Sequence, residues 1–250
     1  MKNEIILWIS SIIIVFLIGY LKSVTSPAYP VTSTFGIEGK KVSYKLDKVS
    51  FDKKSYKNII LSDVEGLKGK LIWIKDNQQH ESDYQKIDRG LECDIPQLKP
   101  GQKIKYKVVL SYGEKTYEIP SKDFITLTFW GNIPSGVKVM TFIFLYGGLL
   151  LSIRSLLELF NNTKNLKKYA VLNCSLFLIL NSLIIPLRNS YKLGAINRYI
   201  PNVLDLLDAN LLIILFIWII GTIFFFYKKF TKPVLMLITI ATVILYFFSN

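Results

Sequence analysis

Residues 5–21 read IILWISSIIIVFLIGYL, an apolar run without a charged side chain. A helix needs about 20 mainly apolar residues to cross the hydrocarbon core of a bilayer. Four further apolar runs follow in the second half of the chain, and the last of them, about 16 residues long, is short for a span. They comprise residues 139–153, 169–187, 211–227 and 233–248. The sequence therefore predicts an integral membrane protein with five transmembrane helices.

The first apolar run has two interpretations. It is a transmembrane anchor, or it is the hydrophobic part of a secretory signal peptide that is removed from the mature protein. The run is long for a signal peptide, and the following residues 22–30, KSVTSPAYP, contain no small-x-small cleavage motif of the A-x-A kind. An uncleaved anchor is therefore the favoured interpretation, and a cleaved signal peptide is the alternative.

The basic residues next to the apolar runs predict the orientation, because short cytoplasmic loops carry an excess of Lys and Arg. One side would hold Lys2, Arg154, Lys164, Lys167, Lys168, Lys228, Lys229 and Lys232. The loop 188–210 on the other side holds only Arg188, Lys192 and Arg198. This asymmetry places the N-terminus in the cytoplasm and the C-terminus outside it, together with residues 23–136.

Residues 23–136 form a different kind of segment, inserted between an anchor at 1–22 and a four-helix transmembrane bundle at 137–250. Short β-rich runs alternate there with turn residues, as is typical of a β-sandwich. In KIKYKVVL (103–110) apolar and charged residues alternate, which predicts a strand with one buried face. The expected strands are residues 42–49, 57–62, 69–75, 84–88, 91–95, 103–112, 115–119 and 125–130. The fold class is thus mixed, with an all-β domain held outside the cytoplasm.

Composition excludes several functions. The formal net charge of +13 does not predict nucleic-acid binding, because the basic residues flank membrane segments or mix with acidic residues in the β domain. Zinc needs more ligands than Cys93, Cys174 and His80 supply, so no metal and no cofactor are expected. His80 lies in the polar stretch 76–83, DNQQHESD, which predicts a hairpin loop.

The stretch LKPGQKIKYKV (98–108) resembles a corner of fibronectin type III and related immunoglobulin-like domains. In those domains a Leu-x-Pro-Gly turn precedes a strand that carries a corner tyrosine. Leu98, Pro100, Gly101 and Tyr106 occupy these places here. The resemblance implies an immunoglobulin-like sandwich in which Tyr106 and Trp73 are core residues, and such domains mostly bind other proteins or act as spacers.

Nearly the whole chain also resembles a family of uncharacterised bacterial membrane proteins with the same plan of one span, a β domain and four spans. The matching pieces are residues 26–31, 95–110, 133–134, 152–154 with Glu158, and 191–210. The resemblance implies location in the bacterial cytoplasmic (inner) membrane. No activity is established for the family, so the resemblance supports an architecture rather than a reaction.

The loop 188–210 is the strongest candidate for a site. Tyr191, Arg198, Tyr199, Asp205 and Asp208 are expected near the membrane surface. If the next helix begins at this point, the two aspartates share its first turn, and one of them is the N-cap. Alternatively, the two carboxylates with Arg198 and Tyr199 bind a cation or a cationic group, or the loop contacts another subunit.

Polar residues inside the predicted spans are few. Asn173 and Asn181 lie on one face of the third helix, which predicts packing of that face against another helix. Arg154 and Glu158 are spaced to form a structural ion pair on the cytoplasmic side. The absence of a charged residue deep in any predicted span disfavours a proton- or ion-coupled transporter.

Two classes of function remain. The first is a non-enzymatic membrane subunit whose β-sandwich binds other membrane or periplasmic proteins. The second is a membrane enzyme or transporter with a site at the outer mouth around Asp205 and Asp208. The first is favoured, because the sequence contains none of the common catalytic or nucleotide-binding motifs.

Overall fold

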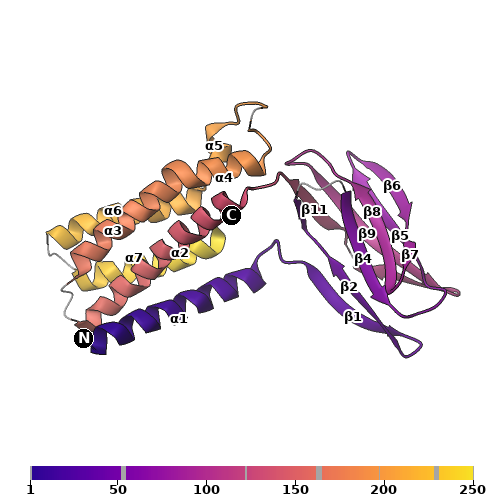
Figure 1. Ribbon diagram of the computed structural model, residues 1–250, viewed down its shortest axis with the longest axis horizontal. Helices are drawn as coiled ribbons and strands as arrows, with labels where there is room; N and C mark the ends of the chain where they lie inside the picture. The colour runs from indigo at the N-terminus through magenta and orange to yellow at the C-terminus, as the bar shows by residue number, and fades with distance from the viewer. Residues whose placement is uncertain are drawn as a thin grey trace. The chain divides into compact units, whose positions relative to one another are not determined.

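A computed structural model describes residues 2–51, 55–121, 123–161, 165–196, 198–227 and 231–249, except for the side chains of residues 2 and 3. The chain forms two compact units (Figure 1). The helical unit comprises residues 1–25, 133–191 and 195–250, and the β unit comprises residues 26–132 and 192–194. The boundaries expected after residues 22 and 136 fall after residues 25 and 132. Lys164, Lys228 and Lys229, used above to predict orientation, lie outside the described residues.

Five helices of the described chain are long and apolar enough to cross a membrane, which confirms the predicted number. The helical elements are α1 (Lys2–Thr25), α2 (Ser135–Leu157), η1 (Glu158–Asn161), α3 (Leu166–Ile179), η2 (Leu180–Ile184), α4 (Ile185–Lys192), α5 (Val203–Leu206), α6 (Ala209–Phe226) and α7 (Thr231–Phe248). The second and third spans extend beyond the apolar runs. Arg154 and Arg188, which the sequence assigned to loops, are therefore helical residues, and that part of the prediction is wrong.

The interior of the helical unit lies between α2, α3, α6 and α7. Trp218, Phe177 and Phe225 are buried there. Gly148 of α2 is required for this packing, because a Cβ at that position would lie 2.7 Å from the ring of Phe177. Helix α1 packs mainly on α2 and leaves most of its side chains exposed, as expected for a surface that faces lipid.

The third span changes its winding at η2, a single π-helical turn. Pro186 lies just beyond this turn. Proline has no backbone N–H, and its ring collides with the carbonyl group of the residue four positions earlier in a regular helix. A π-turn before the proline relieves this conflict, and turns of this kind are common at functional positions.

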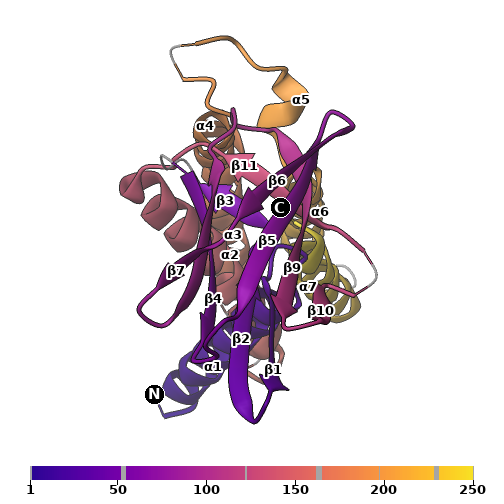
Figure 2. The same ribbon diagram turned by 90° about the vertical axis from the view of Figure 1, so that its right-hand side faces the viewer.

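The β unit contains two sheets that enclose one hydrophobic core (Figure 2). The strands are β1 (Val31–Ile37), β2 (Lys40–Leu46), β3 (Val49–Phe51), β4 (Ser55–Ser62), β5 (Lys68–Lys75), β6 (Gln78–Asp83), β7 (Gln85–Ile87), β8 (Gly90–Pro96), β9 (Lys103–Tyr112), β10 (Lys115–Ile119) and β11 (Ile125–Trp130). One sheet has the order β1-β2-β4-β8-β7. The other has the order β3-β11-β9-β5-β6, with β10 beside β9.

Strand β9 has the alternation predicted from its sequence. Ile104, Tyr106 and Val108 are buried, whereas Lys103 and Lys105 are exposed. Full burial of one aliphatic side chain contributes about 1.5–3 kcal/mol, so each inward residue of this row favours closing the two sheets. Tyr106 is confirmed as a core residue. Trp73 is half-buried and packs against the same core.

Three parts of the predicted β domain are wrong or incomplete. Strand β1 was not predicted, and the expected strand 42–49 is divided between β2 and β3. The polar stretch 76–83 is not a hairpin loop throughout, because residues 78–83 form β6 and only Asp76 and Asn77 form the turn. His80 is therefore a strand residue that pairs with Trp73 of β5.

A short segment after the third span belongs to the β unit. The backbone N–H of Gly131 donates to the carbonyl oxygen of Lys192 at 2.8 Å, and the Lys192 ammonium lies 4.4 Å from the centre of the Trp130 ring. Gly194 has a φ of +65°, and a Cβ there would lie 2.7 Å from Pro100. The chain thus returns to the β unit after the third span, beside the end of β11.

Cys93 provides a test of this core. Its side chain is 3% exposed, and burial raises the pKa of the thiol to about 11. Since the thiolate is the reactive species, we expect a maleimide to leave Cys93 unmodified at neutral pH in the folded chain. Mass spectrometry should detect the adduct only after unfolding in denaturant. Rapid labelling of the folded protein would contradict the described packing.

Candidate functional site

Asp208, one of the predicted site residues, is the N-cap of α6. Its Oδ1 atom accepts hydrogen bonds from the backbone N–H groups of Asn210 at 3.0 Å and Leu211 at 3.1 Å. The side chain is buried. These bonds satisfy two of the amide groups that lack partners at a helix start, and the carboxylate lies at the positive end of the helix dipole. The capping interpretation is therefore confirmed for Asp208.

The remaining predicted site residues do not join Asp208 on one helical turn. Asp205 is exposed in the short helix α5, whose N-cap is Asn202, and the extended residue Leu207 separates α5 from α6. The expectation that the two aspartates share one turn is thus wrong. Arg198 and Tyr199 are exposed, and Tyr191 is half-buried near the end of α4. Within the described ranges, no ion pair connects Arg198 with Asp205.

Asp208 instead interacts electrostatically with Lys22 of α1 and Arg188 of α4. The Lys22 ammonium donates to the carbonyl oxygens of Tyr246 at 2.6 Å and Ser249 at 3.0 Å. It also donates to the Ser249 hydroxyl at 2.6 Å. Cations are favourable at the C-terminal end of a helix, so Lys22 caps α7 and fastens the first helix to the last. In the sequence, Lys22 directly follows the first apolar run, and this position is the feature that could have indicated its capping role.

Asn173 and Asn181 of the third span are buried and form hydrogen bonds to other helices. Asn173 donates to the Ser152 hydroxyl of α2 at 2.9 Å. Asn181, in the π-turn, donates to the carbonyl oxygens of Phe177 at 2.8 Å and Leu211 at 3.2 Å. The second of these bonds links the third span to the first turn of α6, close to the Asp208 cap.

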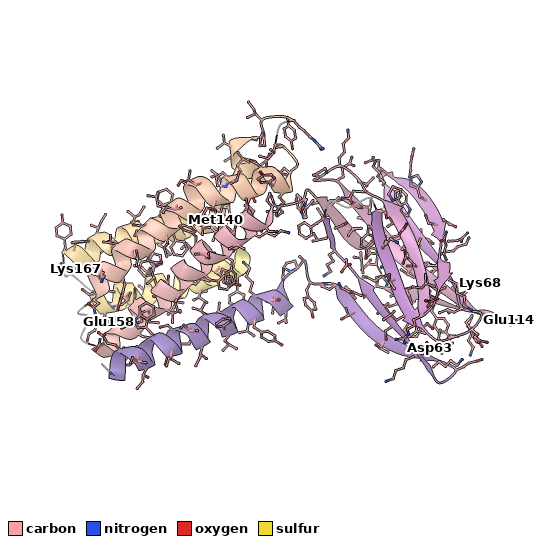
Figure 3. All side chains as sticks on the ribbon, viewed as in Figure 1. Asp63, Lys68, Glu114, Met140, Glu158 and Lys167 are labelled. Atoms are coloured by element: carbon pink, nitrogen blue, oxygen red, sulfur yellow. The ribbon has the colours of Figure 1, made fainter. Side chains whose placement is uncertain are left out.

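A second buried charged site was only partly predicted. Arg154 and Glu158 form the expected i, i+4 ion pair, with Nη1 and Oε2 2.5 Å apart, but both side chains are fully buried. The other Glu158 oxygen accepts from the backbone N–H of Asn165 at 3.1 Å and lies 3.5 Å from the amide nitrogen of Asn161. Figure 3 labels Glu158 at the same end of the helical unit as Lys167. The carboxylate therefore holds together the end of α2, the η1 turn and the start of α3.

Aromatic rings enclose the Arg154 guanidinium. Its central carbon lies 5.4 Å from the Trp8 ring of α1 and 5.0 Å from the Tyr169 ring of α3. Attraction between a cation and an aromatic face strengthens when water is excluded. The Nε and Nη2 atoms of Arg154 are buried and have no hydrogen-bond partner in the described part of the chain. This centre brings α1, α2 and α3 together through charge and aromatic contacts rather than through apolar packing alone.

The β unit contains a buried hydrogen-bond network around Tyr106. Its hydroxyl donates to the carbonyl oxygen of Asp47 at 2.7 Å and lies 3.3 Å from the Tyr56 hydroxyl. The network continues through Asn58 to the hydroxyl of Tyr84. Burial raises the pKa of Tyr106, so its hydroxyl remains a donor. The partners come from both sheets, and a satisfied network of this kind holds the sheets in register.

His80 has a structural role in the described contacts. Its ring stacks on Trp73 with centroids 4.2 Å apart and an interplanar angle of 19°. Among the residues that the structure describes, no group of three or more His, Cys, Asp or Glu side chains is placed to hold a metal ion.

The Asp208 cap leads to a prediction that separates capping from charge. Asp208→Ala should lower stability by about 1 kcal/mol, because alanine leaves the first amide groups of α6 without an acceptor. Asp208→Asn should lose less, since asparagine is an equally good N-cap. Thermal unfolding of the purified chain measures both variants, with exposed Asp205→Ala as the control. Equal losses for the Ala and Asn variants would show that the charge, rather than the cap, is the important property.

The two units define a class: an integral membrane protein whose helices are joined to a domain of two β-sheets. Comparisons with protein-family models, with curated proteins and with solved structures find no match for this chain. Both resemblances noted in the sequence, to fibronectin type III domains and to five-span bacterial membrane proteins, therefore remain predictions.

Proposed function

We propose that this chain is a non-enzymatic subunit of the bacterial cytoplasmic membrane that presents its β-sandwich to a partner protein outside the cytoplasm. The observation that carries the proposal is the position of the connections in the β unit. The start of β1 pairs with the end of β2, and the end of β11 pairs with β3, which follows β2 in the chain. Strand β1 therefore begins, and strand β11 ends, at the same end of the sandwich. We call this the connected end.

The opposite end of the sandwich is formed by turns between strands. The β1–β2 turn at Glu38–Gly39 and the β9–β10 turn at Gly113–Glu114 lie there, and the Tyr112 hydroxyl joins them by donating to Glu38 at 2.7 Å. Figure 3 labels Asp63, Lys68 and Glu114 at this end. Loops at the ends of a sandwich are the usual positions of recognition residues. We call this the turn end.

A recess at the turn end supports partner binding. It has a volume of about 390 Å³ and lies between the β4–β5 loop and the β7–β8 turn. Its apolar lining includes Leu67 and Leu91, and its charged residues include Glu65, Asp88 and Lys86. A surface that combines apolar side chains with polar groups of both signs is typical of a protein interface.

Site-specific photo-crosslinking in intact cells tests the proposal. A photoreactive amino acid at Glu65 or Asp88 should yield one discrete crosslinked protein, identified by mass spectrometry. The same probe at exposed Lys105, on the broad face of strand β9, is the matched control. Discrete adducts at neither turn-end position, or equal adducts at all three, would contradict a partner-binding role for the turn end.

A membrane enzyme or transporter with a site at the outer mouth is the alternative. Buried charge favours it: Asp208 interacts with Lys22 and Arg188 within the helical unit, and charged groups in membrane segments often mark functional sites. The double variant Asp205→Ala with Asp208→Asn removes both charges and preserves the α6 cap. The measurement is whether this variant restores the phenotype of cells that lack the chain. Failure to restore it, with normal folding and normal turn-end crosslinks, would favour this alternative. Retention of the phenotype would exclude it.

A further inference from the structure

The helical unit contains a groove between α1 and α2 with a volume of about 460 Å³. Ile12 and Val15 of α1 and Ile143 and Leu150 of α2 line it with aliphatic side chains. Pockets of this volume with mainly apolar walls and a few polar groups are typical ligand sites. Both helices have the length and composition of membrane spans. A ligand of this groove would therefore enter from the bilayer rather than from water.

The polarity of the groove changes along its length. Towards the end of α1 it is lined by Tyr20 and Ser23, and Tyr146 of α2 lies beside them. The Tyr146 hydroxyl accepts a hydrogen bond from Tyr246 at 2.9 Å and retains a second lone pair and its own proton for another partner. The opposite part, near Ile12, has aliphatic walls. A molecule with a polar head and a hydrocarbon tail matches this gradient.

Glycines of α1 and α2 already pack against side chains of the same bundle. This packing argues against a second transmembrane helix as the occupant of the groove. Close helix packing in membranes depends on small residues that let two backbones approach. At Gly19 of α1 that space is occupied by Tyr146, whose ring would lie 2.9 Å from a Cβ. Gly147 and Gly148 of α2 face Leu176 and Phe177 in the same way. Gly19 and Gly147 belong to the groove wall, but Tyr146 and Leu176 cover them. The groove therefore presents mainly rings and branched side chains, between which a narrow flexible chain fits better than a helix.

We propose that this groove binds one acyl chain of a bilayer phospholipid, with the headgroup at the end marked by Tyr20 and Ser23. The exposed rings of Phe16 and Phe142 lie beside the chain. Because α1 packs mainly on α2, an acyl chain between them adds apolar contact at the least buried helix of the unit. The lipid then forms part of the attachment of the first span.

Photolabelling of the full chain tests this site. The protein is reconstituted in phosphatidylcholine vesicles that contain a trace of phosphatidylcholine with a diazirine within one acyl chain. After irradiation, mass spectrometry locates the labelled residues. We expect labelling of the groove residues at least about fivefold above labelling at Leu237, an exposed position on α7, because burial of one or two methylene groups corresponds to such a factor.

Two variants fill the groove from different helices, Ile143→Trp and Ile12→Trp, and Leu237→Trp is the matched control. Each groove variant that retains the thermal unfolding midpoint of the wild type should lose most of the groove labelling, whereas Leu237→Trp should not. Uniform labelling over α1, α2 and α7 would overturn the proposal, and so would groove labelling that survives both filling variants. A protein crosslink between two copies through α1, abolished by Ile143→Trp, would identify a second copy as the occupant instead.

Discussion

Replacement of Glu158 by leucine is expected to destabilise the helical unit by about 3–5 kcal/mol, the usual consequence of removing one partner of a buried ion pair. The Arg154 guanidinium would keep its charge between the rings of Trp8 and Tyr169 without its carboxylate. The start of α3 would also lose an acceptor, because Glu158 holds the backbone N–H of Asn165. Unfolding of the purified chain in mixed micelles, followed by circular dichroism, measures the loss.

A double variant provides the control for this prediction. Arg154→Met combined with Glu158→Leu removes both charges and retains comparable volume, and it should be more stable than Glu158→Leu alone. Buried ion pairs are often replaceable by apolar residues, whereas isolated buried charges are not. A loss below about 1 kcal/mol for Glu158→Leu would be the value of an exposed pair and would contradict the burial described above.

Gly90→Ala should prevent the β unit from folding with its present register. Gly90 has a φ of +138°, and a Cβ there would lie 1.9 Å from the carbonyl oxygen of Ile60 and 3.1 Å from the Cα of Leu61. These atoms belong to the backbone of β4, which pairs with β8, so a change of side-chain rotamer cannot relieve the collision. We expect a loss at the upper end of single-substitution effects, above about 4 kcal/mol. Protease sensitivity of the β unit in the full chain measures it.

Gly66→Ala is the matched control for Gly90→Ala. Gly66 also has a positive φ, of +76°, but no atom lies within 4 Å of a Cβ at that position. Alanine there should cost only the backbone strain of about 1–2 kcal/mol. Similar protease sensitivity of the two variants would show that the close approach of β8 to β4 is not required for the fold.

Where the sequence has a regular pattern, that pattern predicted the bounds of the strands correctly. Strands β9, β10 and β11 have the predicted bounds, because apolar and polar residues alternate or turn residues mark their ends. Strand β6, QQHESD, has no such pattern. It forms because its backbone pairs with β5 and His80 stacks on Trp73, and neither contact can be read from the local sequence.

The candidate sites also combine features that the local sequence predicts with features that depend on distant contacts. The spacing of Arg154 and Glu158 predicted an ion pair, but a basic residue after an apolar run also resembles a loop residue that marks the cytoplasmic side. Burial of this pair depends on the continuation of α2 and on rings contributed by α1 and α3. Similarly, Asp208 could be assigned as a cap from sequence, whereas its interaction with Lys22 joins residues from distant parts of the chain.

Cysteine accessibility in intact cells tests the proposed topology most directly. One variant carries Glu65→Cys, at an exposed loop of the β unit, and a second carries Lys168→Cys, at an exposed position near the start of α3. The parent chain is the blank. A membrane-impermeant maleimide should label the Glu65→Cys variant in intact cells and the Lys168→Cys variant only after permeabilisation. The reverse pattern, or equal labelling of both variants before permeabilisation, would contradict a β-sandwich held outside the cytoplasm by five membrane spans.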